Sequence, residues 1–129
     1  MGQTQLLLLT LGVILAALAV YSGLNQFVVT AADLNRDALL LDVTNVSADA
    51  QAYYKKPSEI GGGGYSYLGF ETSSYFKKYE NGKMKIRVNS VKEKVVITGT
   101  GTEIGWNGRS KVQVRSVVKP NSIVITLRN

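Results

Sequence analysis

The chain contains no cysteine and no histidine. It therefore has no disulfide bonds, no thiolate or imidazole ligands for a metal, and none of the side chain that most often acts as general base near neutral pH. Its carboxylates are scattered singly, so no pair stands out for acid–base catalysis, and a serine nucleophile would have no imidazole partner. We expect a protein that is not an enzyme and that uses no metal, no cofactor and no small-molecule substrate.

Positive charge is missing from the first quarter of the chain. The first basic residue is Arg36, and the segment from Leu6 to Val29 has no charged residue at all. An ordinary membrane anchor carries Lys or Arg on its cytoplasmic flank, and a secretion signal begins with a basic segment. The missing flank favours a mature N-terminus at Met1, from which a short basic leader has been removed.

The uncharged segment itself is rich in Leu, Val, Ile and Ala. At the helical rise of about 1.5 Å per residue, it is long enough to cross the hydrocarbon core of a bilayer. We expect residues 1–29 to form the hydrophobic half of a helix that serves as membrane anchor or filament core. Ser22 and Gly23 lower helical propensity locally, which predicts bending or melting at that point.

A second, amphipathic half of the helix is expected over residues 30–56. Its apolar residues follow two neighbouring stripes at helical spacing. One stripe contains Phe27, Ala31, Leu34, Ala38, Leu41, Ala48 and Ala52, and the other contains Leu39, Val43, Val46, Ala50 and Tyr54. Packing on the protein's own head explains one stripe, so the other predicts additional neighbours. Lys55, Lys56 and Pro57 are typical of a helix end.

Four consecutive glycines, residues 61–64, mark a connector over residues 57–65. They lack the Lys-Ser/Thr pair of a phosphate-binding loop and the flanking strand and helix of a dinucleotide site. We interpret them as a linker or as backbone that packs closely against a neighbouring segment.

From Tyr65 onward, apolar and polar residues alternate, which is typical of an antiparallel sheet with one buried face. Asn81-Gly82, Asn107-Gly108 and residues 119–121 indicate tight reversals. The predicted strands are residues 65–71, 75–79, 83–91, 94–99, 110–118 and 122–127. The sequence therefore predicts an α+β fold: a helix of about 50 residues packed on an antiparallel meander of four to six strands, with the β head over residues 66–129.

Positive charge is concentrated in that head. The chain carries three basic and four acidic residues through Lys56, but twelve basic and five acidic residues from Pro57 onward. Basic residues alternate with aromatic ones near Tyr75, as in surfaces that bind single-stranded nucleic acid, although rings that fill the seam between helix and sheet are the interpretation we favour. For the positive charge of the head, a plain solubilising surface is the interpretation we favour. The candidate surface for an anionic partner contains Lys77, Lys78, Lys83, Lys85 and Arg87.

This layout resembles the type IV pilins and related pseudopilins. Their N-terminal helix first anchors the subunit in the membrane and later forms the filament core, while its second half lies under an antiparallel sheet. Met1 suits the methylated first position of the family, and Leu6 to Val20 suits its apolar half. Tyr21–Asn25 falls where family helices often melt on assembly, although the proline common there is missing. Gln5 replaces the family's glutamate, and an amide cannot neutralise the N-terminal amine of a neighbour.

The resemblance implies a structural subunit of an extracellular helical filament on the cell surface, with a precursor embedded in the inner membrane and N-terminal processing and methylation at Met1. Its partners would be further copies of the chain, with weak binding of DNA or a surface by the head. The alternative is a single-pass membrane protein whose basic β domain binds a partner or nucleic acid. The residues expected in the filament core are Gln5, Leu6, Leu7, Leu8, Leu9, Leu11, Val13, Ile14, Leu15, Leu18, Val20, Leu24, Phe27 and Val28.

Overall fold

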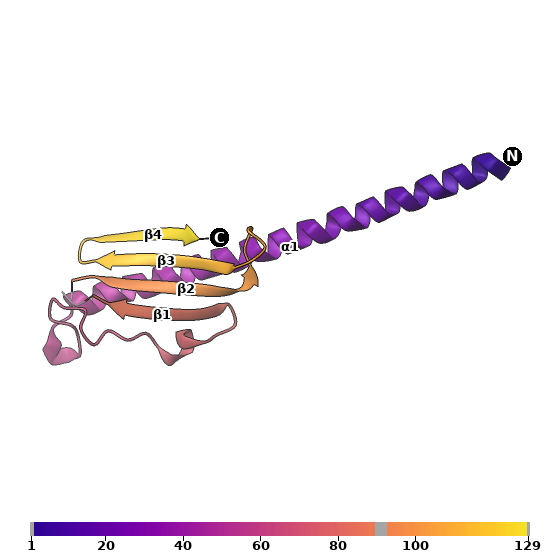
Figure 1. The fold of residues 1–129 in the computed structure, drawn as a ribbon. Helices are drawn as coiled ribbons and strands as arrows, with labels where there is room; N and C mark the ends of the chain where they lie inside the picture. The colour runs from indigo at the N-terminus through magenta and orange to yellow at the C-terminus, as the bar shows by residue number, and fades with distance from the viewer. Residues whose placement is uncertain (1, 90–92, 129) are drawn as a thin grey trace. The chain divides into compact units, whose positions relative to one another are not determined.

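The structure, a computed structural model, describes residues 2–89 and 93–128. It has the expected α+β architecture (Figure 1). It divides into two compact units, one ending at Ala31 and the other beginning at Ala32. The elements are helix α1 (Gly2–Lys55), 3-10 helices η1 (Ser58–Ile60) and η2 (Ser74–Lys77), and strands β1 (Gly82–Val88), β2 (Val95–Ile104), β3 (Lys111–Lys119) and β4 (Ser122–Arg128). Met1 and the last residues of the predicted strand 83–91 lie outside the described residues.

The first unit is the N-terminal part of α1 alone. Residues 2–30 are all helical and all exposed. Ser22 and Gly23 belong to this helix without interruption, and the space that a Cβ would take at Gly23 is open. The sequence predicts bending or melting at these two residues; the helix is continuous there, and their melting on assembly stays a prediction.

In the second unit, residues 32–55 of α1 lie across one face of a four-stranded antiparallel sheet (Figure 1). The strands follow one another in the order β1-β2-β3-β4, which is the predicted meander. Their register places Lys85 opposite Thr98, Thr98 opposite Arg115, and Arg115 opposite Thr126. Side chains from all four strands therefore form straight rows across the sheet, alternately on the helix side and on the outer side.

The core of this unit lies between α1 and the sheet. Leu39, Val43, Val46 and Ala50 are buried, so one predicted stripe packs on the head. Gly99 of β2 allows the helix to come close, because a Cβ there would lie 2.9 Å from Val43 Cγ2 and 3.2 Å from Leu39 Cδ2. Burial of apolar side chains along this line is the main stabilising contribution available to the unit. The buried apolar residues that the sheet contributes are Met84, Val95, Ile97, Val112, Val114 and Val118.

One polar contact crosses the core. Ser47 Oγ lies 2.6 Å from the carbonyl oxygen of Val43 and 2.8 Å from Ser116 Oγ, and both serines are fully buried. Since a hydroxyl has one proton, Ser47 donates to the carbonyl and accepts from Ser116. This pair joins α1 to β3 without leaving a buried hydroxyl unpaired.

The glycine connector packs tightly against the end of α1. Gly63 N donates to the carbonyl of Tyr53 (2.8 Å), Gly64 N to that of Lys56 (3.0 Å), and Tyr65 N to that of Tyr54 (2.9 Å). A Cβ at Gly63 would collide with the backbone of Ser66. The glycines thus satisfy carbonyls that a helix end leaves unpaired, so close backbone packing is the correct one of the two interpretations.

The prediction of strands at residues 65–71 and 75–79 was wrong. Positive φ angles at Tyr65 (62°) and Gly69 (81°) break the extended conformation of the first segment. In the second, the Ser73 side chain accepts from Tyr75 N and caps the 3-10 helix η2. Aromatic residues that alternate with polar ones here fill the seam beside the helix, so the period of two did not indicate a strand. The other four predicted strands are present.

The side chain of Asn35, in the first turns of α1 in this unit, bonds to two segments of the sheet. The Asn35 side chain donates to the carbonyl of Asn81 (3.0 Å) and accepts from Thr102 N (3.1 Å). It also fills the space next to Gly101, where a Cβ would collide with Asn35 Oδ1. One asparagine therefore holds both the turn before β1 and the irregular end of β2.

A third contact with α1 comes from the indole of Trp106, in the loop between β2 and β3. Its Nε1 donates to Asp33 Oδ1 (3.0 Å), and the guanidinium of Arg36 lies 4.0 Å from the ring centroid. Arg36 also pairs with Asp33 at 3.3 Å. Because Trp106 is the only tryptophan of the chain, its fluorescence reports on this contact.

Leu39 and Leu41 offer a matched test of the buried stripe, since Leu39 is fully buried and Leu41 is 66% exposed. We expect Leu39→Ala to lower the free energy of unfolding by about 2–5 kcal/mol, because it opens a cavity under α1. Leu41→Ala should change it by less than about 0.5 kcal/mol. Urea denaturation of the full chain in a non-ionic detergent, followed by Trp106 fluorescence, measures both. Equal losses would contradict the assignment of the buried stripe.

Candidate functional site

An extensive apolar surface lies on the first unit. The large apolar residues from Leu6 to Val28 are between 48% and 75% exposed, and Gln5 is exposed as well. All fourteen residues predicted for the filament core are therefore available to an external partner. A continuous exposed surface of this kind marks a site of contact with lipid or protein.

The helix is also long and apolar enough to cross a membrane, by length and composition. None of its most apolar stretch is buried, which distinguishes it from the core helix of a globular protein. A secretion signal near an N-terminus would have the same composition.

A second apolar surface lies on the helical part of the second unit. Leu34 and Leu41 are each 66% exposed, and Ala48 and Ala52 are exposed beside them. These residues belong to the first of the two predicted stripes, of which only Ala38 is half-buried in this unit. We call them the exposed stripe. The prediction that the head covers one stripe only is confirmed; the neighbours expected on the other stay a prediction.

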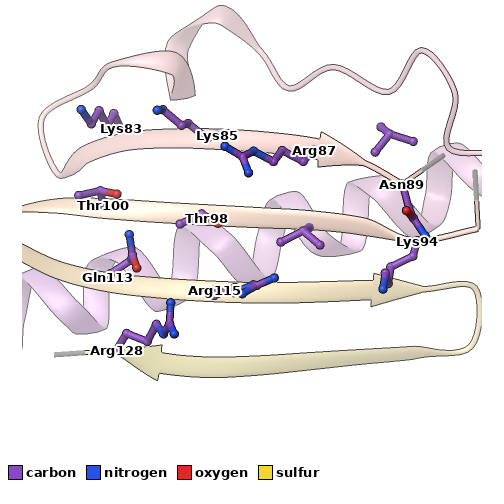
Figure 2. A pocket seen from close by; sticks show the side chains of 12 residues that line it. Lys83, Lys85, Arg87, Asn89, Lys94, Thr98, Thr100, Gln113, Arg115 and Arg128 are labelled. Carbon is purple, nitrogen blue, oxygen red and sulfur yellow. The ribbon is translucent and has the colours of Figure 1, made fainter.

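The outer side of the sheet forms a third surface, which is basic and mostly polar, although the row that contains Arg87 also carries Val96, Val117 and Val124. Lys83, Lys85 and Arg87 project from β1, Arg115 from β3 and Arg128 from β4, all on the side away from the helix (Figure 2). We call these five residues the cationic face. Thr98, Thr100 and Gln113 lie between them, and together with Lys94 they line a shallow hollow of about 720 Å³.

The register explains why these side chains meet. Lys83 lies opposite Thr100, Thr100 opposite Gln113, and Gln113 opposite Arg128, which makes one row across the sheet. Lys85 and Arg115 belong to the next row, on either side of Thr98. On the outward positions of these rows the structure places no acidic and no aromatic side chain.

Carboxylates of the second unit lie elsewhere. Asp33 pairs with Arg36, Asp42 accepts from the Asn81 amide (3.2 Å), and Glu93 lies near the far end of the sheet, where it lines a separate hollow with Lys94. Within residues 2–89 and 93–128, no group of three carboxylates lies where it could hold a metal ion. Among those residues the only ion pair is the one between Asp33 and Arg36, so the five cations of the face form no ion pair within the described part of the chain.

The structure brings together three of the five basic residues predicted for an anionic partner. Lys77 belongs to η2 and lines a different hollow of about 250 Å³ beside Phe70, and Lys78 follows it in the chain. The other two residues of the cationic face are Arg115 and Arg128, which were not predicted from the sequence. Both occupy polar positions in alternating segments, but only the pairing of β3 with β2 and β4 shows that they join β1.

The aromatic residues do not form part of the cationic face. Tyr53, Tyr54, Phe76 and Tyr79 are partly buried against the core, and Tyr67 is fully buried, so the favoured interpretation as a seam between helix and sheet is confirmed. Their rings pack on one another: Tyr54 and Tyr67 lie 4.8 Å apart between centroids, and Phe76 and Tyr79 lie 5.4 Å apart. Tyr65 and Tyr75 are the exposed members of these clusters.

Comparison of the chain with protein-family models, with curated proteins and with solved structures found no match. The function must therefore be argued from the three surfaces themselves.

Burial sets the ionisation of two of the seam tyrosines. The Tyr79 hydroxyl is buried without a hydrogen bond of standard geometry. Its pKa is raised first by this burial and then by the neighbouring carboxylate of Asp42, since both disfavour the phenolate. Burial, followed by the proximity of Tyr54, also raises the pKa of Tyr67.

These shifts predict a loss of stability in alkali. Below about pH 10 the phenols are protonated in both the folded and the unfolded chain. Above it the unfolded chain ionises first, so the free energy of unfolding falls, by at most about 1.4 kcal/mol per pH unit for one phenol. Tyr79→Phe should reduce this slope in urea denaturation between pH 9 and pH 11. Tyr65→Phe, a control at an exposed ring, should keep the slope because it leaves Tyr67 and Tyr79 in place; an unchanged slope in Tyr79→Phe would refute the account.

Proposed function

We propose that the chain is a pilin-like structural subunit, which polymerises through its N-terminal helix into an extracellular helical filament. The observation that carries this proposal is the first unit, a helix whose large apolar side chains from Leu6 to Val28 are all exposed. Such a surface needs either lipid or other apolar helices around it.

A bilayer and a bundle of identical helices are both suitable surroundings. In lipid, an isolated helix is stable because its backbone hydrogen bonds are internal. Outside lipid, copies of the same helix can bury one another's side chains. When two different surfaces of identical subunits meet, each contact adds a further subunit. Unless the rotation between subunits closes a ring, the result is a helical filament. The same helix can thus anchor a precursor and then form the core of a polymer.

The exposed stripe supports assembly over simple anchoring. An anchor requires an apolar surface only where it crosses the bilayer. Leu34, Leu41, Ala48 and Ala52 belong to the second unit, on the part of α1 that carries the head, and they remain uncovered there. Neighbouring subunits in a filament would cover this stripe, whereas a lone membrane protein would leave it in water.

The resemblance to type IV pilins adds a processing step to the proposal. In this proposal the precursor is embedded in the inner membrane, a leader is removed before Met1, and the new amine is then methylated. Gln5, helical and exposed, could accept a hydrogen bond from a neighbour's N-terminal amine in place of the family's glutamate.

The second candidate is a single-pass membrane protein with a basic β domain that binds a partner. It is favoured by the length and composition of α1, which suit a membrane span. The two candidates differ in whether polymer forms and in the N-terminus: intact-mass measurement gives a methylated amine after leader removal for a pilin-like subunit, and an initiator methionine for the anchored protein.

Two substitutions test assembly in cells that produce the protein. We expect both Leu8→Arg and Leu41→Arg to reduce filament yield by more than tenfold, because each would place an unpaired charge in a contact between subunits. Leu8→Arg also weakens membrane insertion, by about 2.5–3.5 kcal/mol at a helix centre. Leu41→Arg leaves residues 6–29 unchanged, so its precursor should still reach the membrane. Electron microscopy and immunoblotting of sheared fractions measure the yield.

Asn121→Arg is the matched control, since Asn121 is an exposed polar residue in the turn between β3 and β4, off the exposed stripe, and the added charge is identical. It should leave the filament yield unchanged. Wild-type protein that stays monomeric in the membrane fraction after shearing would refute the filament and support the anchored alternative.

A further inference from the structure

The proposed assembly uses the apolar surfaces and none of the five residues of the cationic face. This face lies on the side of the sheet opposite the helix, and it is built from paired strands rather than from loops (Figure 2). Residues on a paired sheet keep fixed spacings, so five cations that project from it form a rigid array.

The spacing of residues along a strand and of strands in a sheet arranges the five cations in two lines. Alternate residues of a strand are about 7 Å apart, so Lys83, Lys85 and Arg87 make one line along β1. Neighbouring strands are about 4.8 Å apart, which puts Arg115 on β3 about 10 Å from that line and Arg128 on β4 about 14 Å from it. Thr98, Thr100 and Gln113, which can donate hydrogen bonds, form the floor between the two lines.

The hydrogen-bond donors of the cationic face indicate a ligand that carries phosphate groups. Three of the five cations are arginines, whose planar guanidinium forms paired hydrogen bonds with phosphate oxygens. Hydroxyl and amide groups between them are also common donors to phosphates of nucleic acid. Because none of the described residues that line the hollow carries a carboxylate, no side chain among them competes for these donors.

The lack of aromatic side chains on the described outward positions argues against a single-stranded nucleic acid as the ligand. Single strands are held by aromatic rings on which their bases stack, and no aromatic residue projects from the outward positions. Paired bases are hidden inside a duplex, which presents its phosphates to a binding protein and needs no ring. An open, shallow hollow also suits the convex outside of a duplex better than a small molecule, which requires an enclosed pocket.

We propose that the cationic face binds double-stranded nucleic acid through its phosphates, without regard to base sequence. The contacts are charge-assisted hydrogen bonds from Lys83, Lys85, Arg87, Arg115 and Arg128. Release of counterions from the duplex supplies most of the affinity, so binding weakens steeply with salt. This proposal does not depend on polymerisation, because every residue it uses belongs to one copy of the second unit.

The experiment uses the full chain in a non-ionic detergent and a fluorescent duplex of mixed sequence, with anisotropy measured over a series of salt concentrations. Five phosphate contacts predict a slope of log K against log salt of about −4.5. The combined variant Lys85→Gln, Arg87→Gln, Arg115→Gln should reduce that slope to about −2. Since each contact contributes about 8-fold at 0.1 M salt, it should also weaken binding by more than about 100-fold there.

The matched control carries Lys55→Gln, Lys56→Gln and Lys78→Gln, which remove the same charge from exposed positions off the face. It should bind almost as tightly as the original chain. Equal weakening in both variants would refute the face as the binding site, as would the absence of binding at low salt.

Two further results would overturn the choice of ligand. They are tighter binding of a single strand than of the duplex, and stronger competition by an acidic polysaccharide than by unlabelled duplex. Loss of filaments in the face variant, with normal filaments in the control, would instead assign these cations to contacts between subunits and would equally refute the proposal. Trp106 fluorescence confirms that both variants remain folded.

Discussion

The close approach of α1 to β2 determines which parts of the second unit are exposed. Gly99 leaves room for Leu39 and Val43 to lie directly on the strand, and this contact selects the helical face that is buried. It also decides the orientation of the sheet, because successive side chains of a strand point to opposite sides. Once Ile97 and Val95 point to the helix, Val96 and Thr98 must point away. The exposed stripe and the cationic face are therefore both consequences of one packing contact.

That contact gives the unit two chemically different sides. The helical side carries Leu34 and Leu41 in the open, whereas the described residues that line the hollow on the other side include lysines and arginines but no carboxylate. Apolar surfaces promote association with other copies, whereas dense positive charge opposes contacts between like surfaces and attracts polyanions. A subunit with this division could assemble through one side and bind a ligand through the other, because neither set of residues is needed for both tasks.

The sequence predicts the fold well where periodicity arises from burial. Four strands were predicted from alternating residues, and the buried stripe from helical spacing, because each pattern is the direct result of one face meeting the core. The same rule failed at residues 65–71, where the aromatic residues alternate but Tyr65 and Gly69 have positive φ. It also failed for part of the cationic face. Arg115 is separated from Lys85 by two strand pairings, and register depends on three-dimensional contacts that a single sequence does not reveal.

Small size would link the stability of the head to the assembly that we propose. A β head this small buries a modest core, no disulfide can reinforce it, and residues 39–50 of α1 supply one wall of that core. Anything that binds the folded head stabilises it by mass action. Copies that cover the exposed stripe would bury Leu34 and Leu41 only when α1 is docked, since the unfolded chain does not present them as one surface. Polymerisation would then strengthen the same helix–sheet contact that creates the stripe, so a subunit that is marginally stable alone would become stable in the filament.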